Sequence, residues 1–146
     1  MKDLNNKTAF ITGGSTGIGF GMATTFAKSG MNVAITDIRD EELASAKKKL
    51  SAYTDNVMTF NVDSTDVSAI ENAADELDKT LGPLHVLCNT AGIPGGAPIL
   101  ETDDERWRLV VEVNFFGPVN GISVFLPRMP EHGEDAHLVN TASSSG

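Results

Sequence analysis

The chain has 146 residues, of which 40% are hydrophobic and 21% charged, with 20 acidic against 11 basic side chains. This length predicts one domain, since domains commonly run ~100–150 residues, and the apolar fraction excludes wholesale disorder. The net charge of −9 argues against a nucleic-acid or anionic-membrane surface. The single cysteine, Cys88, excludes an internal disulfide, and no Cys/His spacing indicates a metal site.

The amino end has no apolar signal region. No stretch is expected to approach the ~18 apolar residues of a membrane span. We therefore expect a soluble cytoplasmic protein without a membrane or nucleic-acid partner.

Short apolar runs alternate with amphipathic segments along the chain. The apolar runs end in turn-forming or polar residues, which is typical of buried strands, and they are residues 8–12, 32–36, 57–60, 84–88 and 137–141. The segments between them predict helices over residues 18–29, 40–50, 67–81 and 102–125. This alternation predicts right-handed crossovers and a doubly wound α/β domain with a mainly parallel sheet, spanning residues 1–146.

The last of these helices has several local signals. Thr102 and Glu105 fit a capping box, in which each side chain satisfies a backbone amide of the other residue. The helix is expected to reach Phe125 with an interruption near Gly117 and Pro118.

Two further groups of side chains are interpreted as structural. Trp107 and its neighbours Val110 and Val111 predict a packing face on the long helix. The histidines are scattered along the sequence, at positions His85, His132 and His137.

The turn between the first strand and the first helix is rich in glycine, with the spacing G-x-x-x-G-x-G. Glycine lets the turn bend and lets the backbone approach a pyrophosphate, and the helix amino end offers free N–H groups and a positive dipole. The candidate phosphate-binding residues are Gly13, Ser15, Thr16, Gly17, Ile18 and Gly19. The alternative is a tight turn that binds nothing.

Asp37 lies eighteen residues beyond Gly19, at the carboxyl end of the second strand. A carboxylate there accepts hydrogen bonds from adenosine ribose hydroxyls and repels a 2′-phosphate. Ile38 follows it, where a basic residue would favour the phosphorylated cofactor, and Arg39 is expected to point elsewhere. This pattern favours NAD over NADP.

Further motifs follow in order: Asp63, Asn89-Thr90-Ala91-Gly92, Asn114 and Ser143. Together with the glycine turn, their spacing resembles the short-chain dehydrogenase/reductase family, in its single-domain branch of ordinary length, over essentially the whole chain. The resemblance implies a Rossmann-like fold and NAD(P)-dependent hydride transfer between a secondary alcohol and a ketone. It also implies a small-molecule substrate and a homo-oligomer, a dimer or tetramer, to whose interface the long helix contributes.

The resemblance extends the cofactor site beyond the glycine turn. Asp63 is implied to hydrogen-bond the adenine amino group, with Ser64 beside it; the alternative is that Asp63 caps the next helix, a role that Thr65 and Asp66 also fit. The turn that walls the adenosine and steadies the sheet is matched by Asn89, Thr90, Ala91 and Gly92. Thr90 replaces the usual second asparagine, which puts one side-chain hydrogen bond of that turn in doubt.

Asn114 and Ser143 match the family's catalytic asparagine and serine. The main-chain carbonyl of Asn114 is implied to hold a relay water, and Pro118 has no N–H with which to occupy that carbonyl. The alternative is a proline that only bends the helix. The hydroxyl of Ser143 would stabilise the alkoxide-like charge on the substrate oxygen, although a run of three serines also fits a floppy tail.

The family's reaction also needs a tyrosine and, four residues later, a lysine, which the resemblance places after Gly146. Tyr53 is the only tyrosine of this chain and does not match that motif. We therefore expect an inactive portion of a dehydrogenase, truncated at its carboxyl end; the alternative is a catalytically dead dinucleotide-binding or regulatory module. Several short motifs, Ala9–Gly14 and Pro127–Met129 among them, resemble bacterial dehydrogenases that oxidise benzylic alcohols in lignin-derived aryl ethers.

Overall fold

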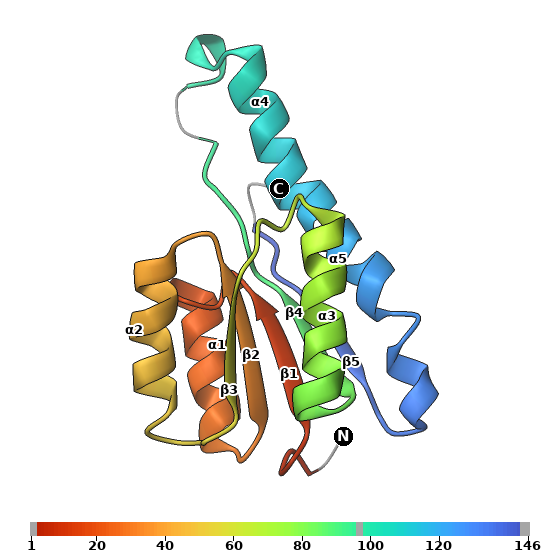
Figure 1. The fold of residues 1–146 in the computed structure, drawn as a ribbon. Coiled ribbons are helices and arrows are strands. Elements are labelled where there is room, and N and C mark those ends of the chain that lie inside the picture. Colours follow the sequence, from red (N-terminus) through yellow and green to blue (C-terminus); the bar gives the residue numbers. More distant parts are fainter. Residues whose placement is uncertain (1–2, 96–97, 144–146) are drawn as a thin grey trace.

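The computed structural model describes residues 3–95 and 98–143, which form a parallel sheet with helices on both faces (Figure 1). The strands are β1 (Thr8–Thr12), β2 (Asn32–Asp37), β3 (Val57–Asn61), β4 (Leu84–Asn89) and β5 (His137–Asn140). The helices are α1 (Gly17–Lys28), α2 (Asp40–Leu50), α3 (Val67–Leu81), α4 (Asp104–Val111) and α5 (Gly117–Phe125). Short helical turns cover Ile99–Glu101, Glu112–Phe116 and Met129–His132. The predicted doubly wound α/β fold is confirmed.

The strand order β3-β2-β1-β4-β5 has one reversal of direction. The chain moves outward from β1 through β2 to β3, then returns to pair β4 on the other side of β1. In such sheets the crevice at the carboxyl ends of the two strands beside the reversal is where ligands bind. The fold therefore places a candidate site above the ends of β1 and β4.

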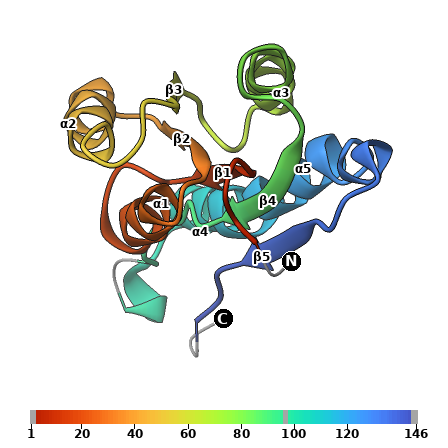
Figure 2. The same ribbon diagram turned by 90° about the horizontal axis from the view of Figure 1, so that it is seen from below.

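Two cores cover the two faces of the sheet, because successive strand residues point to opposite sides. Ala9 and Ile11 pack with α1 and α2, whereas Phe10 packs with α3 and α5. Figure 2 shows these helix pairs on opposite sides of the strands. Phe10 is fully buried, with its ring centroid 4.6 Å from that of Phe125 and 6.2 Å from that of Phe60.

Most predicted element boundaries agree with the structure to within two residues. The helices predicted over residues 40–50 and 67–81 have those limits, and Gly30 ends α1 with a left-handed φ of +81°. The capping box was wrong by one residue: Asp103 caps α4 by accepting from the amide of Arg106 at 2.8 Å. Thr102 instead donates its hydroxyl to the carbonyl of Pro98, which holds it in the preceding turn.

The expected packing face on α4 is not buried in the part of the chain that the structure describes. None of the residues of α4 is buried, and Trp107 and Val111 are each 45% exposed. Figure 1 shows the reason, since α4 rises beyond the carboxyl ends of the strands, away from the sheet.

The expectation that no stretch approaches a membrane span was wrong by length and composition. The helical run Asp104–His132 is long and apolar enough to cross a bilayer. Its second half, however, packs Val124 and Phe125 into the core beside α3. A helix that covers a sheet passes the same test, so this run does not indicate a membrane protein.

Two of the histidines are not scattered but lie together at the amino edge of the sheet. The rings of His85 and His132 are 4.7 Å apart, and Glu134 lies 3.0 Å from Nε2 of His85. The ligand atoms of all three lie within 4.8 Å of one another, close enough to hold a metal. The amide of Thr8, however, donates to Nδ1 of His85, so Nε2 carries the proton and donates to Glu134. His85 therefore uses both ring nitrogens in hydrogen bonds to protein groups, and the cluster is a hydrogen-bonded network.

This network predicts a pH-dependent stability. Burial lowers the pKa of His85, helped by His132 and Lys7 and opposed by Glu134. The unfolded chain therefore takes up a proton near the ordinary histidine pKa of about 6.5, while the folded chain resists it. The free energy of unfolding should fall as the pH drops from about 6.5 towards 5, and His85→Gln should flatten this dependence. Urea titrations at fixed pH values test this; an equal slope in both proteins would contradict it.

Candidate functional site

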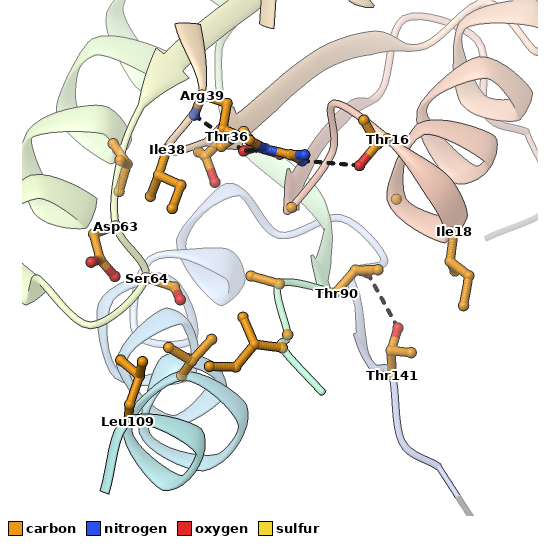
Figure 3. Close-up of a pocket in the computed structure, with 18 of the residues that line it drawn as sticks. Thr16, Ile18, Thr36, Ile38, Arg39, Asp63, Ser64, Thr90, Leu109 and Thr141 are labelled. Carbon is orange, nitrogen blue, oxygen red and sulfur yellow. Dashed lines mark hydrogen bonds and ion pairs between the residues drawn. The ribbon is translucent and has the colours of Figure 1, made fainter. Parts of the chain in front are cut away.

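A cavity of about 680 Å³ lies at the carboxyl ends of β1, β2 and β4 (Figure 3). It is where the strand order predicts a ligand site. Most of the predicted cofactor residues line it: Gly13, Thr16, Ile18, Gly19, Asp37, Ile38, Asp63, Ser64, Thr90, Ala91 and Gly92. The lining does not include Ser15, Gly17, Asn89, Asn114 or Ser143. Segments separated by more than 100 residues thus meet in one pocket.

The glycine turn brings the start of α1 to the floor of the pocket. A side chain at Gly19 would overlap the carbonyl of Gly13, and one at Gly13 would come within 2.8 Å of the Cα of Ala91. Gly13 also has a φ of +63°, which only glycine adopts without strain. Both glycines are therefore required for the turn to close against the end of β4.

The amino end of α1 is arranged to receive an anion. The N-cap residue, Thr16, makes no side-chain capping bond, and the first turn holds no acidic side chain. The first-turn amides have no intrahelical acceptor, and the helix dipole adds positive potential there. Ile18, one of the candidate phosphate-binding residues, is 63% exposed and lines the pocket.

The carboxylate of Asp37 is buried and fully hydrogen-bonded. Its Oδ1 accepts from the amide and Nε of Arg39, at 3.2 and 2.9 Å, and its Oδ2 accepts from Nη2 of Arg39 and from the hydroxyl of Ser15. Burial raises the pKa of Asp37, but these donors outweigh it and hold the pKa below its usual range. Ser15 thus supports the site from behind the pocket wall.

The expectation that Arg39 points elsewhere was wrong. Its guanidinium folds back over Asp37 and also donates to the hydroxyl of Thr16 at 3.1 Å (Figure 3). The nearby carboxylate supplies the reason, since an Arg–carboxylate pair in a partly buried site is a strong, directional contact.

Asp63 and Ser64 line the pocket on the β3 side. Asp63 accepts from the amide and hydroxyl of Thr65, both at 2.9 Å, whereas Asp66 caps α3 through the amide of Ala69. The alternative that Asp63 caps the helix is therefore excluded. Asn120 of α5 donates to the carbonyl of Ser64 at 3.0 Å and holds this loop in place.

The turn after β4 is anchored by Thr12, which the sequence analysis included in the first strand without a role in the site. Its hydroxyl accepts from the amides of Thr90 and Ala91, at 3.0 and 3.1 Å. Asn89 points away from the pocket, is 2% exposed, and donates to Asn140. Asn89 thus steadies the sheet, while Thr90 to Gly92 form the pocket wall.

Asn114 lies in the π-helical turn, where the amide of Gly117 donates to the carbonyl of Glu112, five residues earlier. Such turns are frequent at functional sites, and Pro118, which follows this one, has no N–H to donate to the carbonyl of Asn114. The side chain of Asn114 both accepts from the amide and donates to the carbonyl of Ile93, each at 2.8 Å. This reciprocal pair fixes the loop after β4. The role of the Asn114 carbonyl stays a prediction.

Ser143 is exposed and lies two residues beyond Thr141, which lines the pocket. Other lining residues that the sequence reasoning missed are Thr36, Arg39, Val62, Ile93, Arg106, Leu109 and Val113. Five of them lie next to a predicted site residue in the sequence, so proximity in sequence was the available signal. Arg106 and Leu109 have no predicted site residue beside them in the sequence. Their place in the pocket depends on where α4 lies.

A glycine turn, a helix start and a strand-end carboxylate around one pocket of a parallel sheet define the class of Rossmann-like α/β domains. The short chain dehydrogenase family model matches residues 7–146. The chain therefore belongs to the short-chain dehydrogenase family.

The named relatives of this chain are dehydrogenases as well. The chain is 36% identical over 144 residues to 1-deoxy-11-beta-hydroxypentalenate dehydrogenase of Streptomyces avermitilis, covering 97% of this chain and 53% of that protein. It is 35% identical over 147 residues to C alpha-dehydrogenase of a Sphingobium species, covering 100% and 48%. A short-chain dehydrogenase from Burkholderia phymatum in complex with NAD superposes with a TM-score of 0.93 at 33% identity, covering 98% and 51%. The chain spans about half the length of these relatives.

The two hydrogen bonds that backbone amides donate to the Thr12 hydroxyl predict a large loss of stability when this hydroxyl is removed. Thr12→Val leaves two backbone donors near the pocket without their acceptor and should cost about 2 kcal/mol of unfolding free energy. Thr12→Ser keeps the oxygen and loses one methyl group, and should cost about 0.8 kcal/mol. Denaturant unfolding measures both variants; a Thr12→Val loss no larger than that of Thr12→Ser would contradict the anchoring role.

Proposed function

We propose that this chain forms the cofactor-binding part of a cytoplasmic NAD-dependent dehydrogenase that interconverts a secondary alcohol and a ketone. The observation that carries the proposal is the pocket in which the open amino end of α1 faces the carboxylate of Asp37. The amino end of α1 suits a pyrophosphate, and the carboxylate of Asp37 suits a ribose diol. The volume, about 680 Å³, is in the range of pockets that bury a cofactor-sized ligand. The NAD complex of the Burkholderia phymatum relative supports the same cofactor.

NAD is favoured over NADP by the chemistry around Asp37. A ribose diol can replace the two guanidinium donors of Arg39, while Ser15 and the Arg39 amide keep their bonds to the carboxylate. A 2′-phosphate would meet the same carboxylate at close range and be repelled. NADP remains the weaker candidate, bound through the displaced Arg39.

NAD, when bound, accepts the hydride from the substrate carbon. In this proposal Ser143 hydrogen-bonds the substrate oxygen, and the main-chain carbonyl of Asn114 holds a water in the proton relay. The general acid/base tyrosine and the lysine of the family pattern are not supplied by these 146 residues, since Tyr53 lies far along the chain from Ser143. This chain alone is therefore proposed to bind cofactor weakly, if at all, and to catalyse no turnover.

A second candidate is a dinucleotide-binding module without catalysis. The full-length protein separates the two when it is assayed with NAD and a panel of secondary alcohols, including benzylic ones. NADH formation supports the dehydrogenase, whereas NAD binding without turnover of any alcohol favours the module.

The glycine turn offers a matched pair of variants for the binding test. Gly19→Ala forces the turn away from Gly13 and should weaken NAD binding at least about tenfold, or by 1.4 kcal/mol. Gly21→Ala, on the same helix, meets no atom within 4 Å and should leave the affinity unchanged. Calorimetric titration of the full-length protein with NAD and NADP measures this. Equal losses in both variants, or tighter binding of NADP than of NAD by the wild-type protein, would contradict the proposal.

A homo-oligomer is proposed through the long helical run. Its exposed apolar side chains include Leu109, Val111, Phe115 and Phe116, of which Phe115 is 61% exposed. Several exposed apolar side chains on one helical run are typical of a subunit interface. Phe115→Glu should shift the protein towards the monomer in size-exclusion chromatography with light scattering. Leu100→Glu, at a more exposed site outside the run, should not change the oligomeric state; a monomeric wild-type protein would overturn the interface.

A further inference from the structure

The ends of β4 and β5 are joined by a pair of threonine hydroxyls inside the pocket. The two strands run parallel, and Asn89 pairs with Asn140 at their carboxyl ends. Thr90 and Thr141 are the next residues in register, and both line the cavity. The hydroxyl of Thr141 donates to that of Thr90 at 3.2 Å (Figure 3).

This hydroxyl pair belongs to a continuous chain of contacts. Thr90 is fixed at its amide by Thr12, the last residue of β1 before the glycine turn, and its hydroxyl reaches the sulfur of Met22 of α1 at 3.7 Å. Thr141 is fixed at its amide by the carbonyl of Asn89 at 2.9 Å. The bonds therefore lead from the phosphate-binding turn, through the end of β4, to the residue two places before Ser143.

The carboxyl end of β5 is tied to β4 by two polar bonds of Thr141, from its amide to the carbonyl of Asn89 and from its hydroxyl to Thr90. Polar bonds at a strand end help to set where the residues that follow it lie. Movement of about 1 Å at a reacting group can cost a hundredfold in rate.

We propose that Thr90 is a positioning residue for Ser143, acting through the hydroxyl of Thr141. The inference rests on the proposed function, in which the Ser143 hydroxyl meets the substrate oxygen beside the bound cofactor. Thr90 touches neither the substrate oxygen nor the hydride; it holds the end of β5 at a fixed distance from the turn that walls the cofactor. The loss of its hydroxyl should therefore slow the chemical step without weakening the cofactor complex.

The test compares Thr90→Val, which keeps the shape and removes the hydroxyl, with Thr90→Ser, which keeps the hydroxyl. In the full-length protein, with NAD and the alcohol from the panel that it oxidises fastest, Thr90→Val should lower kcat about tenfold. The NAD affinity measured by calorimetry should stay within about twofold, whereas one lost contact of 1.4 kcal/mol would weaken it about tenfold. Thr90→Ser should restore most of the rate, and Thr80→Val, at an exposed position on α3, should change neither quantity.

The partner residue gives an independent check. Thr141→Val should match Thr90→Val, and the double variant should be no slower than either, because both remove one interaction. The amide of Thr141 should exchange its hydrogen faster in Thr90→Val than in Thr90→Ser. Additive losses, an unchanged kcat in Thr90→Val, or no rescue by serine would overturn the inference while leaving the proposed function intact. A wild-type protein that binds no NAD and oxidises no alcohol would overturn both.

Discussion

The close contact between the glycine turn and the end of β4 is the constraint on which the site depends. Thr12 supplies one acceptor to two amides of the neighbouring turn, and Gly13 brings its backbone against Ala91. A larger residue at Gly13 would force apart the two strands between which the sheet reverses direction. The crevice exists because these two backbones approach without side chains between them, and the helix start is thereby exposed to it.

Electrostatics in this crevice follow from the same geometry. The start of α1 carries no acidic side chain, while α2 begins with three, Asp40, Glu41 and Glu42. Negative charge stabilises the amino end of a helix. Because α1 has no acidic residue there, an anionic ligand can provide this stabilisation. Asp37 is kept ionised by Arg39 and Ser15, and so it retains its capacity to accept hydrogen bonds inside a partly buried site.

The fold and much of the site could be predicted because they depend on local patterns. Asp37 is one example, since it ends a strand that the apolar pattern predicts, and it lines the pocket. Arg39 could not be placed in this way, because its direction depends on a carboxylate two residues away and on Thr16 across the pocket. The His85 and His132 pair is a similar case, since 47 residues separate two side chains that only the return from α5 to β5 brings together.

The interrupted helix connects the remaining parts of the site. Pro118 has no N–H to donate to the helical hydrogen bonds. The helix is not broken there but continues through a π-helical turn that contains Asn114. The widened turn keeps α4 and α5 in one continuous helical run. In this arrangement the Asn114 side chain accepts from the amide of Ile93, and Asn89 donates to the carbonyl of Pro118 at 3.3 Å. A helix broken at the proline would release one of these contacts. The proline is therefore consistent with a catalytic role for the Asn114 carbonyl and also serves the sheet, because the same turn ties the loop above the pocket to the strand beneath it.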